Sequence, residues 1–192
     1  MPSVTGSTTS DSDDVLLARH QNGDDAALNV LFLRYRESAY RVAYRLLSHP
    51  EDALDAVQDG FVKAMLHLGR FEHRSSFKTW LMRVVSNAAL DFGRARRRRD
   101  QLKVAACGQV APEPPGHEPQ VLLEGTELRE RLDEALGQLP EQQRRTFVLH
   151  MDGGLSYREV AEALEISLGT VMSRLFYARQ KLKTLLADRV PS

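Results

Sequence analysis

Arginine is concentrated in one short stretch of the chain, which is the clearest place for contact with a polyanion. The stretch holds Arg94, Arg96, Arg97, Arg98, Arg99 and Lys103, with Asp100 as the only acid among them. Over the whole chain 26 basic and 26 acidic residues cancel, so the cluster would form a basic patch on an otherwise neutral protein. Arginine also favours a helix C-terminus, but five arginines in six positions exceed what a helix dipole requires. The pattern therefore favours a nucleic acid or another polyanion.

A helix predicted from Phe77 to about Asp100 would place these arginines beside other residues that suit nucleic acids. Its core face gathers Phe77, Leu81, Val84, Val85, Ala88 and Phe92. A second face, about 80° wide, gathers Arg83, Asn87, Asp91, Arg94 and Arg98, and Trp80 falls on the same stripe. An aromatic ring can stack on a base, and an amide can bond the edge of a splayed base. The stripe predicts a single-strand contact; the alternative for Trp80 is packing on a neighbouring helix.

The C-terminal part of the chain has the pattern of a helix-turn-helix. Ser156 and Glu159 have the spacing of a capping box at the start of a short helix. In the helix after the turn, Val171, Leu175, Ala178, Leu182 and Leu185 share one face. Ser173, Phe176, Tyr177 and Gln180 point the opposite way, and Arg174 and Arg179 flank the apolar stripe. Outward aromatic side chains favour DNA binding over an αα-hairpin that merely packs.

The turn of this motif carries an unfavourable residue. Glu165 stands where such turns usually have glycine. A left-handed conformation costs a residue other than glycine about 1–2 kcal/mol. The turn is therefore expected to be either strained or differently shaped.

These segments belong to two predicted helical domains. Helical periodicity runs through residues 28–46, 54–68 and 77–100 before a proline-rich segment, and resumes after it at about 124–138 and 140–151. In the second of these segments the apolar residues at helical spacing, expected to form its core face, are Leu54, Val57, Phe61, Met65 and Leu68. No alternating strand pattern occurs. We expect an all-α protein with a polar tail at 1–11, a helical domain at 12–104, a linker at 105–121 and a helix-turn-helix domain at 122–188. Seventeen extended linker residues could span about 50–60 Å. The domains are therefore expected to tumble semi-independently in the free chain and to pack together only when an inhibitor or a crystal form holds them.

Other functions find little support in the composition. No apolar run approaches the length of a membrane span, and the start has no signal-peptide pattern. Cys107 is the single cysteine, so we expect a reduced, cytoplasmic, metal-free protein without membrane insertion. No paired carboxylates, activated nucleophile or glycine-rich phosphate loop occurs in order. The chain is therefore expected to be no enzyme and to use no cofactor or small-molecule substrate.

The motifs, in this order and on either side of the linker, resemble one family. They are Asp55-Ala-Val-Gln58-Asp59-Gly-Phe61, Ser76-Phe-Lys-Thr-Trp80 continuing to Asn87, Arg94 to Arg99, Leu136-Gly-Gln-Leu-Pro140, Leu155-Ser-Tyr-Arg-Glu-Val-Ala161 and Gly169-Thr-Val-Met-Ser-Arg174 continuing to Arg179. Over residues 12–187 the chain resembles the extracytoplasmic-function (ECF) sigma factors of bacterial RNA polymerase. The resemblance implies sigma regions two and four, core polymerase (β′ clamp helices and β flap) and promoter DNA as partners, and an anti-sigma factor as a further candidate.

The resemblance also implies roles for single residues. The polymerase-binding residues would be Asp55, Gln58, Asp59 and Phe61. Contacts to the minus-ten element would come from Trp80, Arg83, Asn87, Arg94, Arg96, Arg97 and Arg98. Contacts to the minus-thirty-five element would come from Arg158, Thr170, Ser173, Arg174, Phe176, Tyr177 and Arg179. The alternative to a sigma factor is a stand-alone helix-turn-helix regulator, which would bind its duplex site without polymerase.

Overall fold

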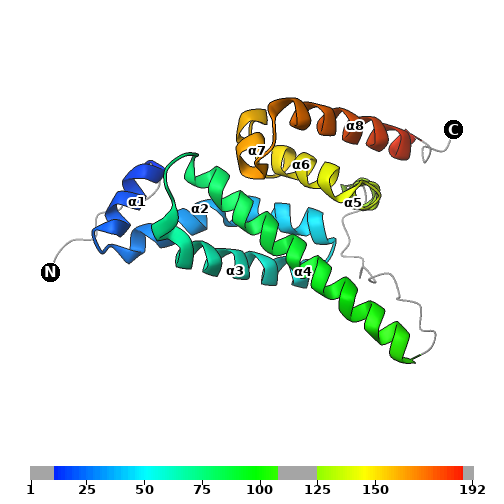
Figure 1. The fold of residues 1–192 in the computed structure, drawn as a ribbon, viewed down its shortest axis with the longest axis horizontal. Helices are drawn as coiled ribbons and strands as arrows, with labels where there is room; N and C mark the ends of the chain where they lie inside the picture. Colours follow the sequence, from blue (N-terminus) through cyan, green and yellow to red (C-terminus); the bar gives the residue numbers. More distant parts are fainter. Residues whose placement is uncertain (1–10, 108–124, 188–192) are drawn as a thin grey trace.

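The computed structural model describes residues 11–107 and 125–187, and these residues form helices joined by turns. The first domain contains α1 (Asp13–Gln21), α2 (Asp25–Leu47), α3 (Pro50–His67), a 3₁₀ turn (Leu68–Arg70) and α4 (Phe77–Cys107). The second contains α5 (Gly125–Gly137), α6 (Glu141–Met151), α7 (Tyr157–Leu164) and α8 (Leu168–Ala187). Figure 1 shows the second group of helices lying along one side of the first. The predicted all-α class is confirmed.

Local sequence explains where the helices begin. Pro50 occupies the first turn of α3. Backbone N–H groups there have no acceptor within the helix, so the missing N–H of proline breaks no hydrogen bond. The Ser76 hydroxyl accepts a hydrogen bond of 3.1 Å from the Thr79 N–H at the start of α4. Ser156 and Glu159 form the predicted capping box of α7.

The close approach of α3 to α4 depends on small side chains. The buried face of α3 consists of Ala53, Ala56, Val57, Gly60 and Ala64. A Cβ atom on Gly60 would lie 3.1 Å from the Cα atom of Val85 in α4, so the two backbones nearly touch.

This packing corrects the predicted core face of α3. Leu54 and Met65 were expected inside with Val57, yet they are 59% and 54% exposed. The reason is that α4 lies too close for large side chains, so α3 turns its small residues inward. Its larger apolar side chains then remain on the outer surface.

The arrangement of the two domains also differs from the expectation of semi-independent tumbling. One continuous cluster of buried apolar side chains joins Leu81, Met82 and Val85 of α4 to Val148 and Val160 of the second domain. We call this packing of α6 and α7 on α4 the closed arrangement. It buries residues on more than one side of α4, and Leu90, outside the predicted core face, is only 6% exposed.

The predicted linker lies mostly outside the described residues. Helix α4 continues to Cys107, so residues 105–107, which were assigned to the linker, are helical. Residues 108–121 of the predicted linker, and most of the predicted polar tail, lie outside the described ranges. Figure 1 shows α4 extending past the rest of its bundle.

The contact between α3 and α4 predicts a strong cost for a large residue at Gly60. Gly60→Leu should lower the free energy of unfolding by about 1–3 kcal/mol, because the side chain would overpack against Val85. Chemical denaturation followed by circular dichroism measures this change. Gly69→Leu is the matched control, since a Cβ atom there meets nothing within 4 Å. Equal stability of the two variants would contradict the close approach.

Candidate nucleic-acid and protein-binding faces

Helix α8 presents an outward surface of the kind the spacing predicted. Its inner face carries Val171, Leu175 and Ala178, which are fully buried. On the opposite side Phe176 and Tyr177 are 56% and 60% exposed, and their rings contact each other edge to face at 5.5 Å. Large aromatic side chains left in water at the surface of a helix mark a contact surface.

Polar residues hold the edges of this surface in place. The Ser173 hydroxyl donates to the Thr170 carbonyl at 3.0 Å, and the Thr170 N–H donates to the Ser167 hydroxyl at 3.1 Å. Arg179 donates to the Tyr157 hydroxyl of α7 at 3.0 Å, and Arg174 donates to Gln142 of α6. Arg158 is exposed on α7. Of the two predicted arginines of α8, Arg179 thus contacts α7 and Arg174 contacts α6.

The turn between α7 and α8 could have been strained or differently shaped, and the structure shows the strained form. Glu165 has φ 54° and ψ 45°, in the left-handed region. Its carboxylate lies 2.7 Å from the Arg83 guanidinium of α4. The residue that strains the turn is therefore also a contact between the two domains.

The second domain contacts α4 at several points along its polar stripe, the face that carries Arg83, Asn87, Asp91, Arg94 and Arg98. Lys78 donates to the Gly154 carbonyl at 2.6 Å, near the start of α4. Further along, the Arg145 guanidinium of α6 donates to the Ser86 hydroxyl at 2.9 Å and to the Asn87 amide oxygen at 2.5 Å. Arg94 pairs with Glu141 of α6 at 2.6 Å. In the closed arrangement Arg83 and Asn87, both predicted to contact the minus-ten element, therefore already have protein partners.

Sequence reasoning missed the interdomain roles of Arg45 and Arg145. Burial, together with the nearby Arg83 and Arg94 charges, lowers the pKa of Arg145 to about 10. Arg45 of α2 forms an ion pair with Asp133 of α5 and lies 3.6 Å from Asp152. Neither arginine belongs to a motif, and only the packing of the domains reveals their partners.

Trp80 lies among aromatic rings. Its ring centroid is 5.3 Å from that of Phe71 and 5.7 Å from that of Phe77, and the side chain is only partly exposed. Neither ring belongs to a neighbouring helix, because Phe71 lies in the segment before α4 and Phe77 in α4 itself. Asn87, two helical turns further on, remains exposed apart from its contact with Arg145.

The arginine run divides into paired and unpaired members. Arg96 pairs with Asp52 of α3, and its Nε atom lies 3.9 Å from the Asp100 carboxylate. Arg97 lies 3.4 Å from the Glu141 carboxylate that also binds Arg94. Arg98 and Arg99 are exposed, and within the described side chains they form no ion pair. With respect to the described side chains, the end of α4 thus keeps guanidinium groups without an ion pair in the closed arrangement.

The outer face of α3 combines acidic and apolar side chains. Asp55, Gln58 and Asp59 are exposed there, and Asp59 pairs with Lys63 at 2.7 Å. The exposed apolar side chains beside them are Leu54, Val62, Met65 and Leu66. Phe61 instead stacks on Phe32 of α2 with the ring centroids 4.7 Å apart, so it supports α3 from inside. Sequence reasoning missed the apolar part of this face because it assigned Leu54 and Met65 to the core.

The described part of the chain offers neither a membrane-spanning helix nor a metal-binding cluster. No helix there is long and apolar enough to cross a bilayer. No group of three or more His, Cys, Asp or Glu side chains in these ranges could hold a metal ion.

Comparison with known proteins accounts for both domains. The family model for sigma-70 region 2 matches residues 31–99, and the model for sigma-70 region 4 matches residues 129–182. The ECF RNA polymerase sigma-E factor of Escherichia coli is 33% identical over 177 residues, which cover 89% of this chain and 92% of that protein. The chain belongs to the ECF sigma factors of bacterial RNA polymerase.

Other relatives extend the similarity of this sigma factor across both regions. The RNA polymerase sigma-H factor of Pseudomonas aeruginosa is 30% identical over 184 residues, covering 93% of this chain and 95% of that protein. The structure of CnrH in complex with the cytosolic domain of CnrY is 28% identical and matches with a TM-score of 0.71, over 94% of this chain and 100% of that chain. The sigma factor RpoE of Bartonella quintana, solved with the anti-sigma factor NepR, is 27% identical. It matches with a TM-score of 0.63, over 83% of this chain and 96% of that chain.

The left-handed turn of this sigma factor predicts a measurable strain at Glu165. Glu165→Gly removes both the strain and the pair with Arg83, whereas Glu165→Gln removes only the pair. The glycine variant should be more stable than the glutamine variant by about 1–2 kcal/mol. The glutamine variant should lie within about 1 kcal/mol of the parent, because the pair is solvent-exposed. Thermal and denaturant unfolding measure both differences; equal stability of the two variants would show that the turn is unstrained.

Proposed function

We propose that this ECF sigma factor acts as a non-enzymatic, cytoplasmic specificity subunit that directs core RNA polymerase to promoters and takes part in their melting. Sigma factors bind core polymerase and promoter DNA, so the proposal concerns which surfaces of this chain do so. The observation that carries it is the presence of two separate candidate DNA surfaces, on α4 and on α8, in one chain with a free outer face on α3. A stand-alone regulator would need only the α8 surface.

The outer face of α3 is the proposed docking site for the β′ clamp helices. Its carboxylates Asp55 and Asp59 suit a basic partner helix. The side-chain amide of Gln58, which lies between them in the sequence, can donate and accept hydrogen bonds. The exposed Val62, Met65 and Leu66 supply the apolar area that a stable interface needs at its centre. Phe61 contributes indirectly, because its stacking on Phe32 holds the orientation of α3.

The polar stripe of α4 is the proposed contact to the minus-ten element. Asn87 is suited to the edge of an extruded base, and Arg83 and Arg94 are suited to flanking phosphates. Arg96, Arg97 and Arg98 would continue this contact along the upstream backbone. Because the second domain occupies Arg83, Asn87 and Arg94 in the closed arrangement, these three residues can bind DNA only after the two domains separate. Binding to polymerase would supply the energy for that opening.

The outward surface of α8 is the proposed reader of the minus-thirty-five duplex. Ser173, Phe176 and Tyr177 would reach base edges in the major groove, and Arg158, Arg174 and Arg179 would meet phosphates along its rims. Thr170 lies in the first turn of α8, where side chains of a recognition helix meet base edges. This surface is exposed even in the closed arrangement. The β flap is the further proposed partner of this domain.

An anti-sigma factor is proposed as a regulatory partner. CnrH was solved with the cytosolic domain of CnrY, and Bartonella RpoE with the anti-sigma factor NepR. The match to CnrH spans both domains of this chain in one superposition. An inhibitor that bound across the closed arrangement would keep the stripe of α4 covered.

The decisive experiment is transcription from a promoter library by purified core polymerase with and without this chain. Promoter-specific transcripts that require both components support the sigma function. Specific binding of the chain alone to duplex DNA, without any change in transcription by core polymerase, would support the stand-alone regulator instead.

Docking through α3 predicts a large effect of charge reversal. Asp55→Arg combined with Asp59→Arg should weaken binding to core polymerase at least about tenfold, because like charges would face each other across the interface. Titration of labelled sigma factor with core polymerase measures this affinity. Asp25→Arg with Glu37→Arg, which reverses two exposed acids of α2, is the matched control and should bind normally. Normal binding by the α3 variant, with its helical content intact, would refute this docking site.

The α8 surface predicts a separation between positioning and specificity. Arg179→Ala should weaken binding to all sequences and lower the salt slope of binding by about one. Ser173→Ala and Tyr177→Ala should instead change the preferred element by about 1–3 kcal/mol at one or two base pairs. Library transcription at two salt concentrations separates the two effects. A uniform loss across the library for Tyr177→Ala would reassign that side chain to the DNA backbone.

A further inference from the structure

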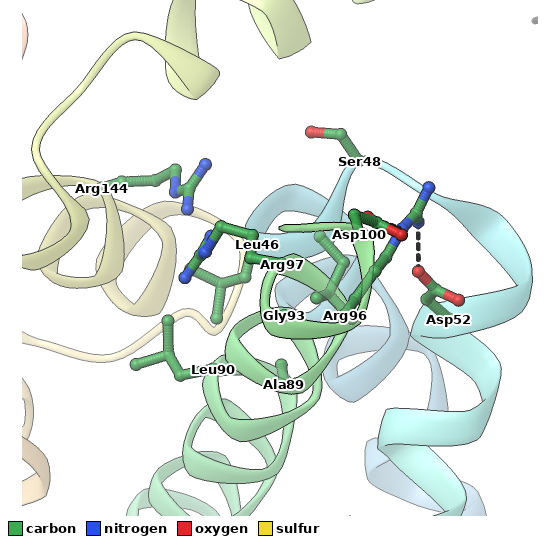
Figure 2. Close-up of a pocket in the computed structure, with 11 residues that line it drawn as sticks. Leu46, Ser48, Asp52, Ala89, Leu90, Gly93, Arg96, Arg97, Asp100 and Arg144 are labelled. Carbon is green, nitrogen blue, oxygen red and sulfur yellow. Dashed lines mark hydrogen bonds and ion pairs between the residues drawn. The ribbon is translucent and has the colours of Figure 1, made fainter. Parts of the chain in front are cut away.

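A cavity of about 300 Å³ lies where the two domains meet, away from the α8 surface (Figure 2). Its walls come from the end of α2, the start of α3, one side of α4 and Arg144 of α6. The floor is apolar and includes Leu46, Ala89 and Leu90. A cavity of this size is large enough for a small ligand.

The positive charges around this cavity are unevenly compensated. Arg96 turns toward Asp52 and is neutralised there (Figure 2). Arg97 and Arg144, which belong to different domains, bring their guanidinium groups near each other on the other side of the cavity (Figure 2). Glu141 is the carboxylate at this end, and it already binds Arg94 at 2.6 Å and Arg97 at 3.4 Å. This one carboxylate thus already pairs with two guanidinium groups, and Arg144 is the third guanidinium group nearby.

Arg144 is the member of this group without a partner. Within the described residues it forms no hydrogen bond or ion pair, and its Nε atom is buried without an acceptor. A buried donor that lacks an acceptor destabilises the fold. Burial, reinforced by the neighbouring Arg97 charge and only partly opposed by Glu141, lowers the pKa of Arg144. The site therefore offers an anion a desolvated donor that nothing in the described chain satisfies.

The chemistry of two facing guanidinium groups selects the ligand class. Each guanidinium can donate two parallel N–H bonds to a phosphate group, and such bonds are stronger over an apolar floor than in water. We propose that the cavity binds a phosphate group, of inorganic phosphate or of a small nucleotide, between Arg97 and Arg144.

Binding at this position would couple to the arrangement of the domains. Arg97 lies on α4 and Arg144 on α6, so a phosphate held by both joins the first domain to the second. A ligand that binds only the closed arrangement stabilises it in proportion to its concentration and affinity. Phosphate would therefore keep the stripe of α4 covered and oppose opening. The proposal stands apart from the function of that stripe, because binding is measured on the isolated chain.

The test is titration of the isolated chain with inorganic phosphate, AMP or adenosine, at an ionic strength held constant with chloride. Arginine Nε–H signals in NMR spectra report the site directly, and the Arg144 signal should shift with saturation. Arg144→Gln should weaken phosphate binding at least tenfold, and Arg97→Gln should do the same from the other domain. Arg36→Gln, which changes an exposed arginine of α2, is the matched control and should bind as the parent does. Small-angle scattering should show that phosphate keeps the parent compact at ionic strengths that expand the Arg144→Gln variant.

The arms of the titration separate the two sources of phosphate. Equal affinities for phosphate and AMP assign the site to the phosphate group alone, and tighter binding of AMP assigns it to a nucleotide; either result supports the proposal. Parental affinity in Arg144→Gln, an effect of phosphate no larger than that of chloride, or equal binding of adenosine and AMP would overturn it. Circular dichroism of each variant establishes that the helices are retained, and removal of an unpartnered buried charge should not unfold them.

Discussion

The packing of α4 against two partners is the constraint on which the other features of this sigma factor depend. One face of α4 lies so close to α3 that Gly60 almost touches the backbone of Val85. Another face carries Arg83, Asn87 and Arg94, each engaged by the second domain. The same helix is therefore the centre of the first domain, the contact between the domains and the proposed reader of the minus-ten element. It cannot serve the second and third roles at once.

This conflict gives the closed arrangement a physical meaning. Individually exposed ion pairs such as that of Arg83 with Glu165 contribute little, because water and salt screen them. The buried apolar cluster that continues from Leu81 to Val160 contributes more, since it removes hydrocarbon from water. Opening therefore requires a partner whose binding offsets the loss of this buried contact. The α8 surface needs no such step, so the two proposed DNA-binding surfaces differ in when they become available.

Several features of the site could be predicted from sequence, and others could not, for identifiable reasons. The outward position of Phe176 and Tyr177 followed from the helical period, because a single helix has one apolar face to bury. The period failed for α3, where the large residues Leu54 and Met65 lie outside and the small Gly60 lies inside. Hydrophobicity ranks residues by size, whereas two helices in close approach select against size. Arg45 and Arg145 carried no signal, since their partners are far away in the chain.

The helical class, the two sigma regions, the capping box of α7 and the outward side of α8 could all be predicted from the amino-acid sequence. These properties are local: each depends on residues within a few turns of one another, which helical geometry places on one face. Three other properties became visible only in the folded chain: the two domains meet, Trp80 lies among aromatic rings, and Arg97 and Arg144 line one cavity. Those properties depend on which faces come together across residues far apart in the chain. That choice follows from complementary shape and charge between surfaces, which no single stretch of sequence contains.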